Sequence, residues 1–262
     1  MADSILLEQR PDGAAILIFN RPAVHNALDR AAMRAFARVV AALAAELSDP
    51  ASATRAVIVT GAGTKAFCSG GDLADLATQR TVDEAAAMIR LMGDALLALE
   101  RLPVPVIAAI NGHALGGGSE IALACDLRVL DETARLGLLQ TQRGLITGWG
   151  GGQRLLRLLG YPRALDALLN ARVFTAAEAL AAGLADRVAP AGEALAGALA
   201  LVEAIAALDP AVVRAVKAAL RAGLLLPFET AIEAERALFP PLWVGDTHVQ
   251  SLETFIKGQR QP

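Results

Sequence analysis

The sequence predicts an α/β protein whose last part is mostly helical. Short apolar runs typical of buried strands alternate with helical patterns along most of the chain, and helical patterns dominate from about Leu195. Two glycine-rich segments each follow one of the apolar runs. We therefore expect a core over residues 1–194 that holds the functional site, and a C-terminal helical region over residues 195–262.

The first elements are expected to be two strands, a helix and a third strand. Ile5–Gln9 and Ala14–Phe19 flank a Pro-Asp-Gly turn, as in a hairpin. Asp29 is placed to cap a helix whose apolar stripe runs from Met33 to Leu43. The wholly apolar run Ala56–Thr60 is typical of a strand that is buried on both faces.

The middle of the chain repeats this order of strand, glycines and helix. A glycine-rich loop covers residues 61–71, and a helical pattern then runs from Met88 to Leu99. Val104–Ile110 reads as another buried strand, and the glycines after it lead into a helix expected to start near Ser119. Another glycine cluster, at residues 148–152, precedes the C-terminal helices.

Composition excludes several classes of protein. The formal net charge of −3 argues against a nucleic-acid partner, which normally requires a basic face. Cys68 and Cys125 are too few for a disulfide framework, so a cytoplasmic location is expected. The apolar stretches are interrupted well before about 18 residues, so no membrane span is expected, and the N-terminus lacks a secretory pattern.

Two glycine junctions are the strongest candidates for chemistry: Phe67–Leu73 and Asn111–Glu120. Glycines let the backbone approach a ligand closely, and free N–H groups at a helix start attract negative charge. Two such donors directed at one oxygen would form an oxyanion hole. Glu120 lies three residues after Gly117, on the same helical face. Glycines here also serve as plain turns, but the spacing fits neither a dinucleotide fingerprint nor a P-loop.

Four segments resemble the enoyl-CoA hydratase/isomerase (crotonase) superfamily in their order and separations. They are NRPAVHNAL at 20–28, AFCSGGDL at 66–73, INGHALGGGSEIALACDLRV at 110–129 and GLITGWGGGQRL at 144–155. The resemblance extends from about Ile5 to Lys257. It implies a crotonase (ClpP-like) fold, in which a spiral of β-β-α turns is followed by C-terminal helices that assemble a homotrimer or homohexamer.

The resemblance also implies roles for single residues around an acyl-CoA substrate. The N–H groups of Gly71 and Gly117 would hold the thioester oxygen. Ala23 and His25 would lie near the adenine and phosphates of CoA. The resemblance implies neither a metal nor a cofactor, because the CoA thioester is itself the substrate.

Four further positions are expected near CoA. Asp72 and Leu73 follow the first glycine junction, although Asp72 suits equally well as a cap for the next helix. Phe255 and Lys257 match the place where the family's C-terminal helix reaches a CoA site, commonly that of a neighbouring subunit. The alternative for Lys257 is a solvated lysine on a terminal helix.

The resemblance breaks down at one important position. Glu120 matches the first of two glutamates that hydratases use, but the second position, twenty residues later, holds Gln140. An amide can orient water but cannot transfer a proton near neutral pH. Either Glu120 carries protons alone in hydration or isomerisation, or the reaction is decarboxylation of methylmalonyl- or ethylmalonyl-CoA. Decarboxylation needs no base, and a neutral Gln140 would not repel the substrate's carboxylate.

Two other classes compete with an acyl-CoA enzyme. Ser119 with His113 suggests a serine hydrolase, but no G-x-S-x-G pattern surrounds Ser119. A non-catalytic acyl-CoA-binding protein is the other alternative, which the presence of Glu120 beside both glycine junctions disfavours. Trp149 is expected either to form the floor of an acyl pocket or to brace the glycine turn at residues 148–152.

Overall fold

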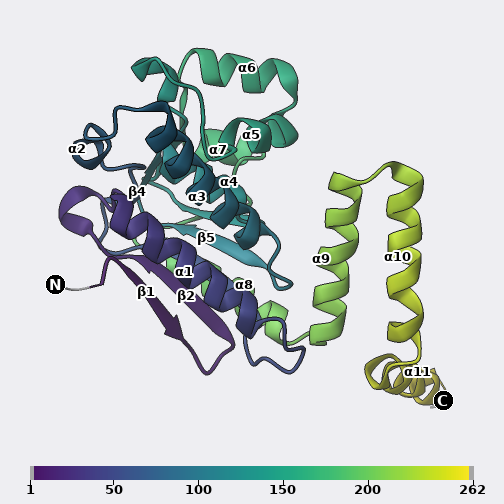
Figure 1. Cartoon of the computed structure of the whole chain (residues 1–262). Helices are drawn as coiled ribbons and strands as arrows, with labels where there is room; N and C mark the ends of the chain where they lie inside the picture. Colours follow the sequence, from purple (N-terminus) through teal and green to yellow (C-terminus); the bar gives the residue numbers. More distant parts are fainter. Residues whose placement is uncertain (1–2, 260–262) are drawn as a thin grey trace. The chain divides into compact units, whose positions relative to one another are not determined.

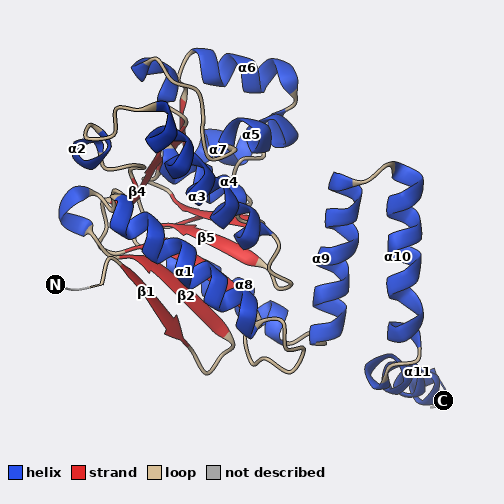
Figure 2. Ribbon diagram, in the orientation of Figure 1, coloured by secondary structure: helices blue, strands red, loops and turns tan. Residues whose placement is uncertain are grey.

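Within residues 3–259, the part of the chain that this computed structural model describes, the strands form two mixed sheets (Figure 2). The larger sheet has the order β1-β2-β3-β5-β7-β10, and the smaller one the order β4-β6-β8-β9. The β1–β2 and β8–β9 pairs are antiparallel, and the other pairs are parallel. The strands are β1 (Ile5–Gln9), β2 (Ala14–Phe19), β3 (Ala56–Gly61), β4 (Ala66–Cys68), β5 (Val106–Ile110), β6 (His113–Leu115), β7 (Leu127–Asp131), β8 (Arg135–Gly137), β9 (Val173–Thr175) and β10 (Arg187–Ala189).

From β3 to β8, successive strands alternate between the two sheets, which confirms the predicted spiral of β-β-α turns. β3 lies in the larger sheet and β4 in the smaller one, and helices α2 and α3 follow. β5 and β6 repeat this step before α4, and β7 and β8 repeat it again. Because β4, β6 and β8 are parallel neighbours, the segments that follow them leave from the same end of the smaller sheet, and both glycine junctions lie there.

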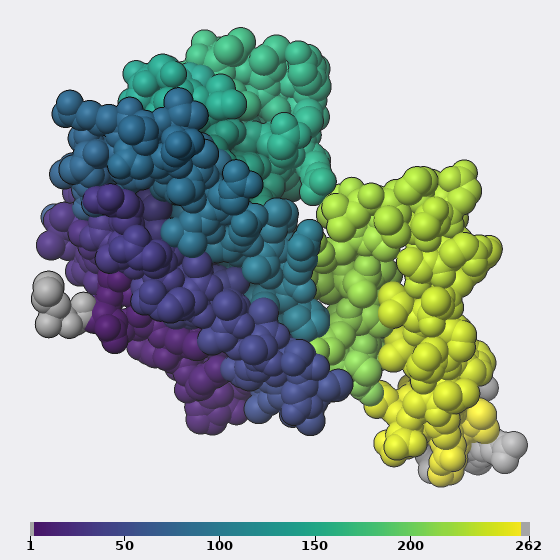
Figure 3. All heavy atoms as spheres, viewed as in Figure 1, coloured from purple at the N-terminus to yellow at the C-terminus, as the bar shows by residue number. Residues whose placement is uncertain are grey.

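The helices of this spiral pack around its sheets (Figure 1). They are α1 (Arg30–Glu46), α2 (Leu73–Leu76), α3 (Val82–Glu100), α4 (Gly117–Ala124), α5 (Gly151–Leu159), α6 (Tyr161–Leu169), α7 (Ala176–Ala182) and α8 (Ala194–Ala206), with short 3-10 helices η1 (Pro22–Val24) and η2 (Gln140–Arg143). α1 and α3 pack side by side and share one face of the molecule (Figure 3). Asp29 caps α1 as predicted, since its carboxylate accepts the Ala32 N–H at 2.8 Å.

A cluster of buried aromatic rings packs around Phe67, the first residue of the first glycine junction. The Phe19 ring stacks on Phe36 of α1 at 5.8 Å and meets Phe67 edge-on at 5.5 Å, and all three rings are fully buried. Burial of such rings contributes roughly 1.5–3 kcal/mol each. Because Phe67 lies in β4, three residues before Gly70, its burial fixes the strand from which the glycines of this junction leave.

Two predicted boundaries were wrong by a few residues. α4 begins at Gly117, not near Ser119, because Gly116 adopts φ +54° and serves as the residue before the helix. The strand expected from Val104 begins at Val106. The first correction matters for function, since it makes Gly117 the first residue of a helix.

The chain divides into two compact units at Glu203 and Ala204. Leu195, where we expected the helical region to begin, lies inside α8. That helix buries Ala198, Leu201 and Val202, and its Gly197 lies directly against Val129 of β7, so most of α8 belongs to the first unit.

The second unit contains α9 (Pro210–Leu225), α10 (Phe228–Trp243) and α11 (Asp246–Gln259). α9 and α10 pack against each other, and Asp209 caps α9 through the Ala211 N–H. Many large apolar side chains of this unit are exposed, among them Leu220, Leu224, Phe228, Phe239, Trp243 and Phe255.

In the described part of the chain, no single helix combines the length and apolar composition that a membrane span requires. α8 and α9 reach that composition only when taken together across a sharp bend.

Candidate active site

The two glycine junctions meet in the structure, as the resemblance implied. A methyl group on Gly70 would lie 2.8 Å from the Gly117 nitrogen, and one on Gly118 would lie 1.8 Å from the Cys68 carbonyl oxygen. Gly70 also has φ +95°, which other residues rarely adopt. Side chains at these positions would push the two backbones apart, so glycine is required here for close approach.

This approach brings two unused amide groups close together. In the bridge to Leu28, the Leu28 N–H donates to Gly70 O at 2.8 Å and the Asp72 N–H donates to Leu28 O at 2.9 Å. That pairing uses the neighbours of Gly71 and leaves its own N–H free. The Gly117 N–H has no acceptor within its helix because Gly117 is the first residue of α4. Two such donors provide what an oxyanion requires.

Glu120 is held in a fixed position behind Gly117. Only 2% of the residue is exposed. One carboxylate oxygen, Oε2, accepts the backbone N–H groups of Trp149 and Gly151 at 2.8 Å each. Burial raises the pKa of the Glu120 carboxyl above its usual value, and the amide donors oppose this rise. A carboxyl group can serve both as a base that accepts a proton and as an acid that returns it.

Gln140 lies directly beside Glu120, at the start of η2. Its amide Nε2 donates to Glu120 Oε1 at 2.9 Å. An ionised carboxylate only accepts hydrogen bonds, so the amide must present its NH₂ group to Glu120 and direct its oxygen elsewhere. That oxygen, Gln140 Oε1, is buried and has no hydrogen-bond partner among the described residues. A buried acceptor without a donor is a suitable place for a water molecule.

Trp149 serves both parts of the site. Its indole ring packs on Gly117, where a methyl group would lie 2.2 Å from Trp149 Cζ3. Its ring N–H donates to the Met88 sulfur at 3.3 Å, and only 6% of the residue is exposed. The ring thus lines the space beside the oxyanion donors, while the backbone N–H holds Glu120.

Arg154 supports the turn that holds Glu120, a role the sequence did not predict. Its Nη1 donates to Trp149 O at 2.7 Å, and its Nε donates to the Glu100 carboxylate at 2.6 Å. Gly150 lies against this guanidinium and has φ +94°. The sequence did contain a signal for this role: Arg154 stands on the apolar side of α5, and a buried arginine requires partners.

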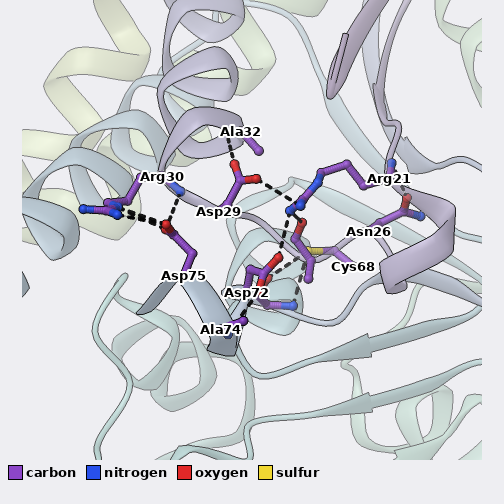
Figure 4. Close-up of polar contacts among 11 residues, drawn as sticks. Arg21, Asn26, Asp29, Arg30, Ala32, Cys68, Asp72, Ala74 and Asp75 are labelled. Carbon is purple, nitrogen blue, oxygen red and sulfur yellow. Dashed lines mark hydrogen bonds and ion pairs between the residues drawn. The ribbon is translucent and has the colours of Figure 1, made fainter. Parts of the chain in front are cut away.

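Figure 4 shows a second support, on the side of Gly71. The Arg21 guanidinium lies between two carboxylates, 3.0 Å from Asp29 and 3.2 Å from Asp72. Asp72 also caps α2 by accepting the Ala74 N–H at 3.1 Å. Of the two roles left open for Asp72, the structure shows the cap. The ion pairs tie the segment after Gly71 to the start of α1.

The other predicted CoA contacts in the first unit lie on its surface. Ala23 is in η1, His25 follows it with φ +54°, and both are exposed. The His25 carbonyl accepts the Ser69 N–H at 3.1 Å, so this segment adjoins the first glycine junction. Leu73, at the start of α2, is 57% exposed.

Phe255 and Lys257 lie on α11, in the second unit, and both are exposed. Lys257 Nζ is 3.4 Å from the Glu253 carboxylate one helical turn earlier. At this degree of exposure such a pair contributes about 0.3–0.5 kcal/mol.

The serine hydrolase alternative is wrong. Ser119 is fully buried, and its Oγ lies 2.6 Å from Ala114 O and 2.9 Å from both O and N of Gly137. His113 is exposed and is not among these partners. The hydroxyl therefore joins β6 and β8 to α4, with no base to activate it.

The described residues also provide no site for thiol catalysis or for binding a metal ion. Cys68 and Cys125 are buried and free, and burial raises the pKa of the Cys68 thiol to about 12, so it stays protonated. Residues 3–259 contain no group of three or more His, Cys, Asp or Glu side chains arranged to hold a metal ion.

Known proteins are similar to this chain over nearly its whole length. A sequence model described as Enoyl-CoA hydratase/isomerase matches residues 9–261. The short-chain-enoyl-CoA hydratase of Clostridium acetobutylicum is 32% identical over 98% of this chain and 96% of its own. The 2,3-dehydroadipyl-CoA hydratase of Escherichia coli is 33% identical, over 97% and 96%.

A solved structure agrees with these relatives. The enoyl-CoA hydratase from Bacillus anthracis superposes with a TM-score of 0.89 at 34% identity, covering 99% of this chain and 98% of its own. These relatives support hydration or isomerisation, and none of them favours the decarboxylase alternative.

Proposed function

Because this chain belongs to the enoyl-CoA hydratase/isomerase family, we propose that it adds water to an enoyl-CoA with Glu120 as the only proton carrier. The observation that carries the proposal is the contact between Glu120 and Gln140, in which one partner can transfer a proton and the other cannot. The chemistry must therefore pass through a single carboxylate.

The thioester oxygen binds between the N–H groups of Gly71 and Gly117. When water attacks C3 of the substrate, negative charge moves to this oxygen and forms an enolate. Both donors are in place before the reaction, so they stabilise the charge without reorganisation. Loss of one donor of this kind costs about 10²–10³ in rate.

Glu120 and Gln140 together hold the attacking water. Glu120 Oε1 accepts one hydrogen of the water, and Gln140 Oε1, otherwise without a partner, accepts the other. As the C3–O bond forms, Glu120 takes the first of these protons. It then delivers that proton to C2, and the enolate electrons form the new C–H bond. One water is added in total and no electrons are lost, so the reaction needs no redox cofactor.

The environment of Glu120 supports both halves of this cycle. Desolvation favours its protonated form, and the amide donors from Trp149 and Gly151 favour its ionised form. A group that alternates between base and acid works best when neither form is strongly preferred.

The direct test is a pair of substitutions assayed by mass spectrometry. Glu120→Gln should reduce hydration of crotonyl-CoA by about 10²–10⁴. Gln140→Glu should raise the rate by supplying a second proton carrier. If Gln140→Glu suppresses turnover and ethylmalonyl-CoA is consumed by the wild type, the enzyme is a decarboxylase. A product with a shifted double bond and no added water would identify an isomerase.

We also propose that the protein is a cytoplasmic homotrimer or homohexamer. The exposed apolar side chains of the second unit support assembly, because surface area of this kind is usually covered. In such an assembly Phe255 and Lys257 would contribute to a CoA site. Two free cysteines suit a reducing compartment. Light scattering at micromolar concentration tests the assembly, and a stable monomer would contradict it.

A further inference from the structure

A hollow of about 230 Å³ lies between α1 and the first half of α3, beside the proposed active site. Its wall includes Arg30, Met33 and Arg34 from α1 and Gln79, Glu84 and Met88 from α3 and the segment before it. The proposed function gives this hollow no role.

Two methionines connect the hollow to the oxyanion donors. The Met33 Cε atom lies 3.7 Å from the position that a methyl group on Gly71 would take. The Met88 sulfur accepts the indole N–H of Trp149, whose ring packs on Gly117. An acyl chain that leaves the thioester along this indole therefore enters the hollow between apolar side chains.

Besides its apolar residues Met33, Ala87, Met88 and Leu91, the wall carries polar groups, and two of these have no partner within residues 3–259. Gln79 Nε2 is buried and has no acceptor among the described residues. The Arg34 guanidinium is exposed and forms no ion pair within the described part of the chain. A buried donor without an acceptor destabilises the site, and a ligand oxygen that accepts from it removes that cost.

The other charged groups of the wall are already paired. Arg30 donates to both oxygens of Asp75, at 3.0–3.1 Å. Glu84 Oε2 accepts the backbone N–H groups of Arg80 and Thr81 and the Thr81 hydroxyl, in the capping box of α3. The groups still available to bind a ligand are therefore the amide N–H donor of Gln79 and the guanidinium of Arg34.

From this arrangement we propose, on the basis of the hydratase function above, that the preferred acyl group ends in a carboxylate. The apolar part of the chain lies along Met33 and Met88, and the terminal carboxylate accepts from Gln79 Nε2 and pairs with Arg34. A plain alkyl chain would leave the Gln79 N–H without an acceptor. A site with a buried donor discriminates more strongly than an apolar pocket does.

The test compares two substrates of equal length, hex-2-enedioyl-CoA and hex-2-enoyl-CoA, which differ only in a terminal carboxylate or methyl group. We expect kcat/KM to favour the carboxylated substrate at least tenfold. Gln79→Leu and Arg34→Met should each lower that ratio about tenfold. Arg38→Met, one turn farther along α1 and outside the hollow, should leave the ratio unchanged.

Binding separates this proposal from the proposed function. Calorimetry with the saturated analogues adipyl-CoA and hexanoyl-CoA requires no chemistry, and it should show the same preference and the same loss in both variants. If neither enoyl substrate turns over but adipyl-CoA still binds more tightly, the hydratase proposal fails and this one stands. Equal affinities in the wild type, or a ratio that neither variant changes, would overturn it. A neutral 6-hydroxyhex-2-enoyl-CoA that equals the enedioyl substrate would also overturn the carboxylate assignment.

Discussion

Replacing Gly117 by alanine tests the central geometry of the site. The added methyl group would lie 2.2 Å, 2.6 Å and 2.9 Å from three carbons of the Trp149 ring. Ordinary contact begins near 3.4 Å, so the ring or the Gly117 backbone must move by about 1 Å. The same tryptophan donates its backbone N–H to Glu120, so the shift disturbs the oxyanion donor and the proton carrier together.

The expected loss follows from this displacement. A misplacement of about 1 Å in an active site can cost about 10²-fold in rate, equivalent to about 2.7 kcal/mol. We therefore expect Gly117→Ala to lower kcat/KM for crotonyl-CoA about 10²-fold. The double variant Gly117→Ala/Trp149→Leu should recover part of the loss, because the smaller side chain removes the clash.

Gly93→Ala is the matched control for this experiment. Gly93 lies in α3, and a methyl group there meets nothing within 4 Å. Alanine should stabilise that helix by about 0.5–1 kcal/mol without affecting turnover. The assay is a crotonyl-CoA progress curve combined with thermal unfolding of each variant. Wild-type activity in a folded Gly117→Ala variant would refute the placement of Gly117 beside the reacting thioester.

Three further predictions concern the groups around Glu120. Arg154→Met should move the acidic limb of the kcat/KM profile to higher pH, because loss of the bond to Trp149 O loosens the N–H donors that lower the Glu120 pKa. The control Arg157→Met, on the exposed side of α5, should leave the limb in place. An unmoved limb in Arg154→Met would show that Arg154 has only a structural role. Because the folded-state pKa of Glu120 is raised, wild-type stability should fall as pH rises from the ordinary carboxyl range through that pKa. Glu120→Gln should remove this decline and increase the free energy of unfolding at pH 7 by about 0.5–2 kcal/mol, which thermal unfolding would show as a higher melting temperature. A lower melting temperature would contradict the predicted direction of the stability change. Ser119→Ala should destabilise the fold by about 1–3 kcal/mol through unpaired groups on β6 and β8, and wild-type Ser119 should resist fluorophosphonate labelling.

The fold and the positions of most candidate site residues could be predicted from local sequence patterns together with the family resemblance. Strands such as Ile5–Gln9 and Ala14–Phe19 were predicted with their observed bounds because period and turn residues are local properties. The glycine junctions were visible for the same reason, since a run of glycines between a strand and a helix needs no partner to be recognised. The family resemblance assigned Glu120 and Gln140 to one site, and the structure places their side chains in contact.

The partners that surround these residues could not be predicted from the sequence, because they come from distant segments of the chain. The N–H groups that hold Glu120 come from 29 and 31 positions later in the chain, and Arg154 reaches Glu100 across 54 positions. The roles of Asp72 and Ser119 likewise depended on partners from other elements, Arg21 for the first and Gly137 for the second. Hydrogen bonds and ion pairs act over about 3 Å in space, so contacts between distant segments exist only after the spiral has brought those segments together.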